Sequence, residues 1–444
     1  MTARDTIFAP ATPAGRGGVA VLRLSGPGAG PALAALTRRP LPAPRTATLA
    51  ELRDPADGAA LDRGLVLWFP GPASYTGEDV AELHLHGGRA VTRGVVEALS
   101  RIDGLRPAEP GEFTRRAFQA GKLDLTEAEA VADLVDAETR AQRLQALRQL
   151  GGALGRLYEG WRAGLMRALV MTEAALDFPD EGLPPDLAAE AEALVAAVSA
   201  AIADHLDDSG RGERLRDGVH IAILGPVNAG KSSLLNALAR RDAAIVSDRP
   251  GTTRDVVEVA LDLRGFPVVL ADTAGLRDTE DEIEAEGIRR SHRRAAEADL
   301  RLVIRDAAEA ASSDPALGPG PDVIRVANKI DVVGLMGAPD AVLAPDEIAI
   351  SVRSGAGLDR LLEALAEAVE RRLTGDGSPA LTRARHRAAL LDAADALARV
   401  PSAPLPELAA EDLRLALRAI GRITGRVDVE DMLDLLFGSF CIGK

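Results

Sequence analysis

Residues 225–232, GPVNAGKS, have the types and spacing that point most directly to chemistry. They fit the pattern G-x-x-x-x-G-K-[ST] and directly follow the apolar, strand-like run 219–224. Glycines in such a loop let backbone N–H groups surround phosphate oxygens at the start of a helix. Lys231 is then placed to reach the β- and γ-phosphates of a nucleotide, and the Ser232 hydroxyl is a ligand for Mg²⁺. The alternative is a purely structural glycine-rich turn between a strand and a helix.

Two later motifs argue against that alternative. Residues 251–254 (GTTR) precede a strand and offer Thr253 as the hydroxyl that contacts Mg²⁺ and the γ-phosphate. Residues 272–275 (DTAG) follow a strand, so Asp272 is predicted to hold the metal through water and the Gly275 N–H to contact the γ-phosphate.

The motif at 328–331 (NKID) identifies the base. The Asp331 carboxylate can accept hydrogen bonds from the ring N–H and the exocyclic amine of guanine, and adenine lacks this pair of donors. Residues 351–354 (SVRS) stand where GTPases usually carry a Ser-Ala-Lys-like loop, with Val352 as the departure. Together the motifs predict a GTP site that includes Ala229, Gly230, Lys231, Ser232, Ser233, Thr253, Asp272, Thr273, Ala274, Gly275, Asn328, Lys329, Asp331 and Ser351.

The group that activates water is not obvious from the motifs. In Ras-like proteins a glutamine follows D-x-x-G and orients the water, but here that position is Leu276, which cannot form such a bond. The acidic stretch 280–284 lies just downstream. One of its carboxylates could position the water, or all of them could be solvated residues at a helix N-terminus.

The elements that must position these motifs alternate along residues 217–373. Strand-like runs at 219–224, 256–261, 268–271, 300–304, 323–327 and 348–350 are separated by helical stretches, which is typical of an α/β domain with a largely parallel sheet. Helical texture flanks this region on both sides, so the α/β domain is predicted to be inserted into a helical domain.

The flanking regions differ in texture. Residues 1–120 mix short apolar runs (18–24, 64–69 and 80–85) with Pro/Gly turns, as in an α+β unit. A capping-box pattern at 126–129 predicts a helix start, and apolar residues then recur at helical spacing at Val131, Leu134, Val135, Leu144, Leu147 and Leu150. The predicted domains are 1–120, 121–216 (helical, first part), 217–374 (G domain) and 375–444 (helical, second part, with the C-terminal tail).

Composition limits the class of protein. A formal charge of −15 argues against a general nucleic-acid binder, because an acidic surface repels phosphate backbones. A single cysteine among 444 residues excludes an intramolecular disulfide and fits a reducing cytoplasm. The sequence shows no signal-peptide pattern and no apolar run of about 20 residues, so a soluble, cytoplasmic protein without membrane association is expected.

Over nearly its whole length the sequence resembles the MnmE family, also called TrmE, the tRNA-modification GTPases of bacteria and organelles. The segments that carry this resemblance are DTIFAPATPAGRGGVAVLRLSG (5–26), GEDVAELHLHGG (77–88), PGEFTRRAFQAGKLDLTEAEAVADLV (110–135) and the terminal FCIGK (440–444), together with the nucleotide motifs. The resemblance implies an N-terminal α+β domain that dimerises and binds a tetrahydrofolate, an α-helical bundle domain, and an inserted Ras-like α/β P-loop G domain.

The resemblance also implies roles for residues. K⁺ would activate hydrolysis when two G domains meet across the homodimer, and Glu284 would be the catalytic, water-positioning carboxylate. Asn228, Ser247 and Thr252 would contact GTP and, with Arg249, would hold K⁺. The folate, 5-formyl- or methylene-tetrahydrofolate, would contact Arg23, Glu82, Lys122 and Lys444. Taken without the resemblance, these four residues read as ordinary surface or paired charges.

The function implied is a GTP hydrolase that works with a flavin-containing MnmG-type subunit, in a heterotetramer, on tRNA. It would add a carboxymethylaminomethyl-type group at C5 of the wobble uridine, with the tetrahydrofolate as one-carbon donor. An alternative is a GTPase switch for ribosome or complex assembly with no modification role. A stand-alone folate-dependent transferase is disfavoured because the GTPase motifs are complete.

The C-terminal Cys441 and the pair His84/His86 leave smaller questions. Residues 441–444 have the spacing of a prenylation box, but Gly443 is not aliphatic and Lys444 is not a usual last residue. Apolar neighbours are expected to bury Cys441 and raise the pKa of its thiol, while a role of that thiol in one-carbon chemistry stays open. The H-x-H pair resembles metal ligands, but no third ligand is nearby.

Overall fold

The computed structural model of the chain describes residues 5–178, 184, 186–241, 243–245, 258–272, 298–309, 322–332, 343–344, 346–375, 378–427 and 430–443. It divides into two compact units. One unit consists of residues 1–132 with 418–444, and the other of residues 133–417. The chain's last residues therefore pack with its first.

The first unit is built on a six-stranded sheet of order β3-β4-β5-β2-β1-β6. Neighbouring strands are antiparallel except for the parallel pair β1 and β6. The strands are β1 (Thr6–Pro10), β2 (Gly17–Ser25), β3 (Thr48–Arg53), β4 (Ala60–Phe69), β5 (Val80–Gly87) and β6 (Leu105–Pro107). The runs predicted at 18–24, 64–69 and 80–85 are thus strands β2, β4 and β5.

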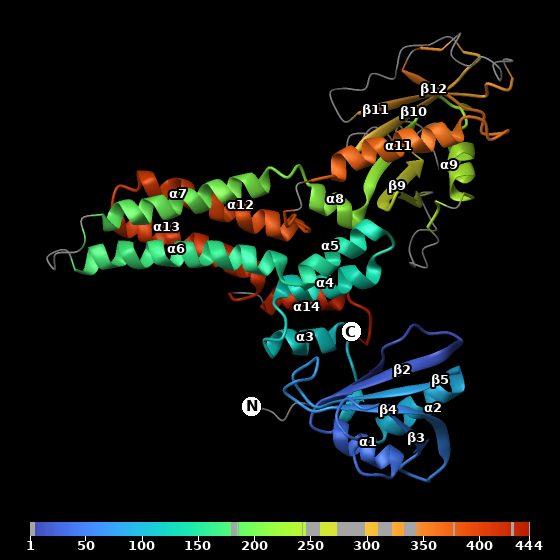
Figure 1. Cartoon of the computed structure of the whole chain (residues 1–444), viewed down its shortest axis with the longest axis vertical. Coiled ribbons are helices and arrows are strands. Elements are labelled where there is room, and N and C mark those ends of the chain that lie inside the picture. Colours follow the sequence, from blue (N-terminus) through green and yellow to red (C-terminus); the bar gives the residue numbers. More distant parts are fainter. Residues whose placement is uncertain are drawn as a thin grey trace, which may run out of the picture. The chain divides into compact units, whose positions relative to one another are not determined.

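Alternation along the strands separates the two faces of this sheet. Phe8, Leu22, Leu24 and Leu83 join one core cluster with α1 (Ala29–Thr37) and α2 (Arg89–Ser100), and Figure 1 shows both helices beside this sheet. The residues between them in sequence point to the other face, because side chains along a strand alternate. There α3 (Glu112–Gln119) contributes Phe113 to a separate cluster. Helix α14 (Glu430–Gly438) packs against α3.

Helix α4 (Leu125–Asp136) begins one residue before the predicted capping pattern. Asp124, not Thr126, is the cap: its Oδ1 accepts from the Glu127 N–H at 2.8 Å, and the Glu127 carboxylate accepts from the Asp124 N–H at 2.8 Å. The reciprocal pair is a capping box, and Thr126 is instead fully buried. The box was predicted two residues too late because both D-x-x-E and T-x-x-E spacings occur in this segment.

The second unit contains a helical part and a G-domain part. The helices are α5 (Arg140–Leu150), α6 (Ala153–Asp177), α7 (Leu187–Leu206), α8 (Arg211–Asp217) and α12 (Ala384–Arg399), followed by η3 (Val400–Ser402) and α13 (Pro406–Thr424), whose last seven residues belong to the first unit. Helices α6, α7 and α12 run side by side (Figure 1) around Tyr158, Leu165, Ile202 and Leu390. The predicted helical stretch therefore forms, but Val135, Leu144 and Leu147 on it are exposed rather than core residues.

The G-domain part is a six-stranded sheet of order β12-β11-β10-β7-β9-β8. All pairs are parallel except β8 with β9, the antiparallel edge. The elements are β7 (Val219–Leu224), α9 (Lys231–Ala239), β8 (Glu258–Leu263), β9 (Phe266–Asp272), β10 (Leu300–Asp306), β11 (Val323–Asn328), β12 (Glu347–Ala349) and α11 (Leu358–Leu373). Each strand lies within two residues of a predicted one, and the predicted inserted α/β fold is confirmed.

Candidate functional site

The loop between β7 and α9 has a backbone that requires glycine at two points. Gly225 has φ +150°, and a Cβ there would lie 2.0 Å from the Ile304 carbonyl oxygen. Gly230 has φ +100°, and a Cβ there would lie 2.4 Å from Asn328 Nδ2. Side chains rarely adopt these conformations, and each would collide with a neighbouring strand. The loop therefore turns tightly and leaves its N–H groups at the N-terminus of α9, where anions are favoured.

Lys231 and Ser232 open helix α9. Lys231 is buried, and its ammonium donates to the carbonyl oxygens of Gly225 at 2.8 Å and Pro226 at 2.9 Å. Burial lowers the pKa of Lys231 below its ordinary value, and the nearby Asp272 carboxylate opposes that shift. The Ser232 hydroxyl donates to Asp272 Oδ2 at 2.5 Å. A hydroxyl and a carboxylate placed together are the hard oxygen donors that Mg²⁺ prefers, so these residues fit the metal.

Asn328 at the end of β11 joins the phosphate loop to the predicted base-binding residues. Its Nδ2 donates to the Ala229 carbonyl oxygen at 2.9 Å, and its Oδ1 accepts from the Val352 N–H at 3.2 Å. Asp331 accepts from the Ser351 hydroxyl at 2.7 Å, while Lys329 donates to Asp306 at 2.8 Å. These contacts bring residues from three separate motifs to one edge of the sheet.

The structure explains why valine is compatible with position 352, although Val352 departs from the usual pattern. Its side chain packs against the core of the G-domain part, and its N–H stays in use as a donor to Asn328. A contact made through the main chain does not depend on the residue type at this position.

Several predicted residues lie outside the described part of the chain: Ser247, Arg249, Thr252, Thr253, Thr273, Ala274, Gly275, Glu284 and Lys444. Asn228 is described, with φ +63°, and Ser233 is exposed.

On the first unit, Arg23 and Glu82 face each other across β2 and β5. They are paired in the strand register, and Arg23 Nε donates to Glu82 Oε1 at 3.0 Å. The guanidinium also lies over the rings of Tyr75 (5.5 Å to the centroid) and Phe113 (5.8 Å). His84 Nε2 lies 3.4 Å from the second carboxylate oxygen of Glu82. The sheet face opposite α1 and α2 thus presents a carboxylate, a cation and two aromatic rings together.

The C-terminal tail is fixed next to that face, within the same unit. Gly443 has φ +98°, and a Cβ there would lie 2.1 Å from the carbonyl oxygen of Pro10. Pro10 follows Ala9, the register partner of Arg23. Further back, the Gly111 N–H donates to the Cys441 carbonyl oxygen at 3.4 Å. The backbone of residues 441–443 is therefore held against β1 and the start of α3.

Cys441 and Lys122 are both exposed near this face. The expectation that apolar neighbours bury Cys441 is wrong: Cys441 is exposed, as is Ile442, while Phe440 packs against Phe437 and takes the buried position. Lys122 is exposed, and the aliphatic part of its side chain lies near Gly77. Among the described residues, no hydrogen bond or ion pair joins Lys122 to Arg23 or Glu82.

Sequence reasoning missed the ion pairs of Arg116 and Arg106 in this unit. Arg116 is buried and forms ion pairs with Glu78 at 3.0 Å and Glu112 at 2.9 Å. Arg106 adds a second contact to Glu112, and the two arginines lower the pKa of that carboxyl even though burial raises it. The signal was present in the consecutive arginines of PGEFTRR, but spacing alone did not show which of them turns inward.

Among the described residues, no group of three or more His, Cys, Asp or Glu side chains could hold a metal ion; His86 pairs with Asp62, at 2.8 Å. No described helix combines the length and the apolar character needed to cross a membrane.

Comparisons with known proteins extend over the whole chain. A family model described as "MnmE helical domain" matches residues 125–441, and one described as "GTP-binding protein TrmE N-terminus" matches residues 6–122. Proteins named tRNA modification GTPase MnmE from Rhodospirillum rubrum and Parvibaculum lavamentivorans are both 58% identical to this chain. Each alignment covers 99% of this chain, and 99% and 100% of the two relatives respectively.

Solved structures add less. A variant of Era from Aquifex aeolicus, bound to GDP and aluminium fluoride, is 24% identical and covers 42% of this chain and 69% of its own, with a TM-score of 0.26. That likeness is too weak to carry an argument. The strand order and the phosphate loop define the G-domain part.

Proposed function

Because the chain belongs to the MnmE family of tRNA modification GTPases, it is a GTP hydrolase of tRNA modification, and we propose the chemistry that its two sites serve. A tetrahydrofolate bound on the first unit supplies one carbon. A carboxymethylaminomethyl-type group is built at C5 of the wobble uridine of certain tRNAs, together with a flavin-containing MnmG-type partner. The GTP cycle drives a conformational change rather than the bond chemistry.

The observation that carries this proposal is the Arg23–Glu82 face with the anchored tail beside it. A carboxylate accepts from two adjacent donors, and the ring N–H and amine of a pterin are such a pair. Tyr75 and Phe113 offer aromatic surface for a flat ring. Arg23, held by Glu82, offers a cation for a carbonyl or a glutamyl carboxylate. These groups fit a reduced folate; Lys122 and the terminal Lys444 are proposed to complete the site.

At the nucleotide site, Ser232 and Asp272 would hold Mg²⁺, with Thr253 as a further ligand, and Asp331 would read guanine. Mg²⁺ supplies charge neutralisation at the phosphates. K⁺ is proposed to bind at Asn228 with Ser247, Arg249 and Thr252 when two G domains meet in the homodimer.

Glu284 is proposed to orient the attacking water. Glu284→Ala should keep GTP affinity and lose most of the K⁺-stimulated turnover. An unchanged K⁺-stimulated kcat would remove Glu284 from this role.

The proposed partners follow from the net charge of the chain and from its family. With a net charge of −15 the chain is poorly suited to bind tRNA alone. We propose that a heterotetramer with the flavin-containing subunit supplies much of the tRNA contact, in the cytoplasm.

Binding of 5-formyl-tetrahydrofolate tests the proposal. The wild-type chain should bind it, and Arg23→Ala should weaken binding at least tenfold, since a hydrogen bond to a charged group contributes about 1.5–3 kcal/mol. Arg53→Ala is the matched control, because Arg53 lies on β3 of the same sheet and pairs with Glu51. Absence of folate binding to the wild-type chain would favour a regulatory GTPase switch instead.

A further inference from the structure

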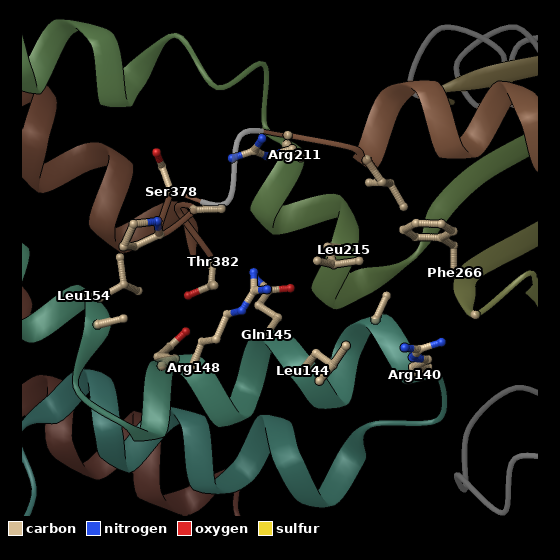
Figure 2. Close-up of a pocket in the computed structure, with 18 of the residues that line it drawn as sticks. Arg140, Leu144, Gln145, Arg148, Leu154, Arg211, Leu215, Phe266, Ser378 and Thr382 are labelled. Atoms are coloured by element: carbon tan, nitrogen blue, oxygen red, sulfur yellow. The ribbon is translucent and has the colours of Figure 1, made fainter.

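A cavity lies in the second unit, lined by residues that belong neither to the nucleotide site of that unit nor to the Arg23–Glu82 face. It measures about 330 Å³, near the lower end of the roughly 300–1,000 Å³ typical of small-molecule sites. Its walls come from α5, the start of α6, α8, the turn between β8 and β9, and the segment that leads into α12 (Figure 2). It therefore lies between the helical part and the G-domain part of one compact unit.

The walls of this cavity are tied together by hydrogen bonds. The Ala141 N–H donates to the Gly265 carbonyl oxygen at 2.9 Å, and Gln145 Nε2 donates to the Gly212 carbonyl oxygen at 3.2 Å. Arg216 donates to the Thr382 carbonyl oxygen at 3.1 Å. These contacts connect α5, α8, the β8–β9 turn and the segment before α12, so the cavity is preformed.

The charge of the lining has one sign. Four arginines line the cavity, and none of the lining residues is acidic, although the chain as a whole has 67 acidic and 52 basic residues. Arg264 is paired with Glu363 and Glu370. Within the described part of the chain, the other three form no ion pair; they are Arg140, Arg148 and Arg211. An uncompensated cluster of this kind favours an anion.

The lining includes polar atoms that have no hydrogen-bond partner among the described residues. Thr382 is 2% exposed, and neither its hydroxyl oxygen nor Gln145 Oε1 has a partner among the described residues. Figure 2 shows Gln145 and Arg148 extending from α5 toward Thr382, with Arg211 on the opposite wall. A buried hydroxyl without a partner costs free energy that a ligand would recover.

The rest of the lining is apolar. Leu144, Leu215 and Phe266 form one end of the cavity, and Leu154 lies toward the other; Pro379 also belongs to the lining. Inorganic phosphate would leave these surfaces uncovered, so the expected ligand has an apolar body as well as a charged group.

We propose that this cavity binds a small organic anion, a carboxylate or phosphate ester, with its charged group at Arg148 and Thr382 and its apolar body against Leu144, Leu215 and Phe266. The proposal does not depend on the folate, tRNA or GTPase chemistry above. Its test can therefore fail while those hold, or succeed while they fail.

The probe for the test is 1-naphthyl phosphate, titrated calorimetrically into the full chain saturated with GDP, so that the phosphate loop is already filled. Arg148→Met should weaken binding at least tenfold, and Thr382→Val about fivefold, as expected for losing a charged and a neutral hydrogen bond. Arg143→Met is the matched control, since Arg143 is an exposed residue of α5 that does not line the cavity.

Thermal melting separates a binding role from a structural one. Because the Thr382 hydroxyl has no partner among the described residues, Thr382→Val should leave Tm unchanged or raise it. A lower Tm with unchanged probe binding would show a structural role and overturn the assignment. So would absence of binding to the wild-type chain, equal binding of uncharged 1-naphthol or of inorganic phosphate, or an equal loss in Arg143→Met.

Discussion

Replacing Ser351 by alanine tests how this chain holds Asp331, the carboxylate proposed to read guanine. The Ser351 side chain is fully buried, and its hydroxyl donates to Asp331 Oδ1 at 2.7 Å. The Ser351 hydroxyl oxygen in turn accepts from the Ser354 N–H at 3.2 Å. Ser351 therefore fixes Asp331 in one orientation before any base arrives, and Ser351→Ala removes that constraint without changing the carboxylate.

The size of the effect follows from this geometry. A hydrogen bond to a charged group contributes about 1.5–3 kcal/mol. Asp331 is half-buried, so water replaces part of what is lost. We expect a loss of about 1–1.5 kcal/mol in GDP binding, a roughly 5- to 12-fold higher Kd. The inosine analogue IDP lacks the exocyclic amine and forms one hydrogen bond fewer with Asp331, so its Kd should rise less.

Titration of a fluorescent GDP analogue, with unlabelled GDP and IDP as competitors, measures both affinities. Ser199→Ala is the control, because Ser199 is half-buried on α7 and far from these motifs in sequence. An unchanged GDP affinity would refute the positioning role of Ser351. Equal losses for GDP and IDP would also refute it, because the effect would then not act through the base.

Three further substitutions have defined outcomes. Gly443→Ala should displace the tail from Pro10 and weaken 5-formyl-tetrahydrofolate binding at least tenfold, with GTP hydrolysis unchanged. Gly230→Ala should push Asn328 away from the phosphate loop and weaken GDP binding at least tenfold. Burial lowers the pKa of His205 to about 4 against the opposing effect of Asp208, so the unfolded chain takes up a proton below about pH 6.5 that the folded chain does not. The free energy of unfolding in urea should therefore fall by about 1–2 kcal/mol from pH 7.5 to pH 5, and His205→Gln should reduce that fall.

Each of these substitutions has a matched control. Gly438→Ala is the control for Gly443→Ala, because it places a Cβ in open space on α14. Gly355→Ala is the control for Gly230→Ala, because it adds backbone strain at φ +84° without a collision. His86→Gln removes an exposed histidine instead of a half-buried one. If a control reproduces the effect of its test variant, the explanation by collision or by burial is wrong.

The phosphate loop could be predicted from the sequence because its information is local. A strand, a glycine-rich turn and a helix start follow one another without interruption, and the elements β7 and α9 are where they were expected. The contact of Asn328 with Ala229 could not be predicted in the same way. It joins residues 99 positions apart and depends on the order of strands in the sheet, which no local pattern encodes.

The face around Arg23 was predictable only in part. Because side chains alternate along a strand, Arg23 lies on the other face of the sheet from Leu22 and Leu24. Its pairing with Glu82 depends instead on the register between β2 and β5. Cys441 shows the limit of reasoning from neighbours: one of two apolar neighbours, Phe440, takes the buried position, and the thiol is left exposed. Burial at a chain terminus is decided by what the tail packs against, here β1 and α3.

Transfer of a labelled carbon to tRNA tests the central claim most directly. The reaction contains the full chain, the flavin-containing partner, tRNA, GTP, K⁺, Mg²⁺, methylene-tetrahydrofolate labelled with ¹³C at the methylene carbon, and unlabelled glycine as the source of the carboxymethylamino group. Mass spectrometry of the tRNA nucleosides should find one ¹³C in the C5 substituent of the wobble uridine, and much less with Glu82→Gln. A modified uridine without the label, or equal labelling with Glu82→Gln, would contradict the proposal that this chain holds the carbon donor.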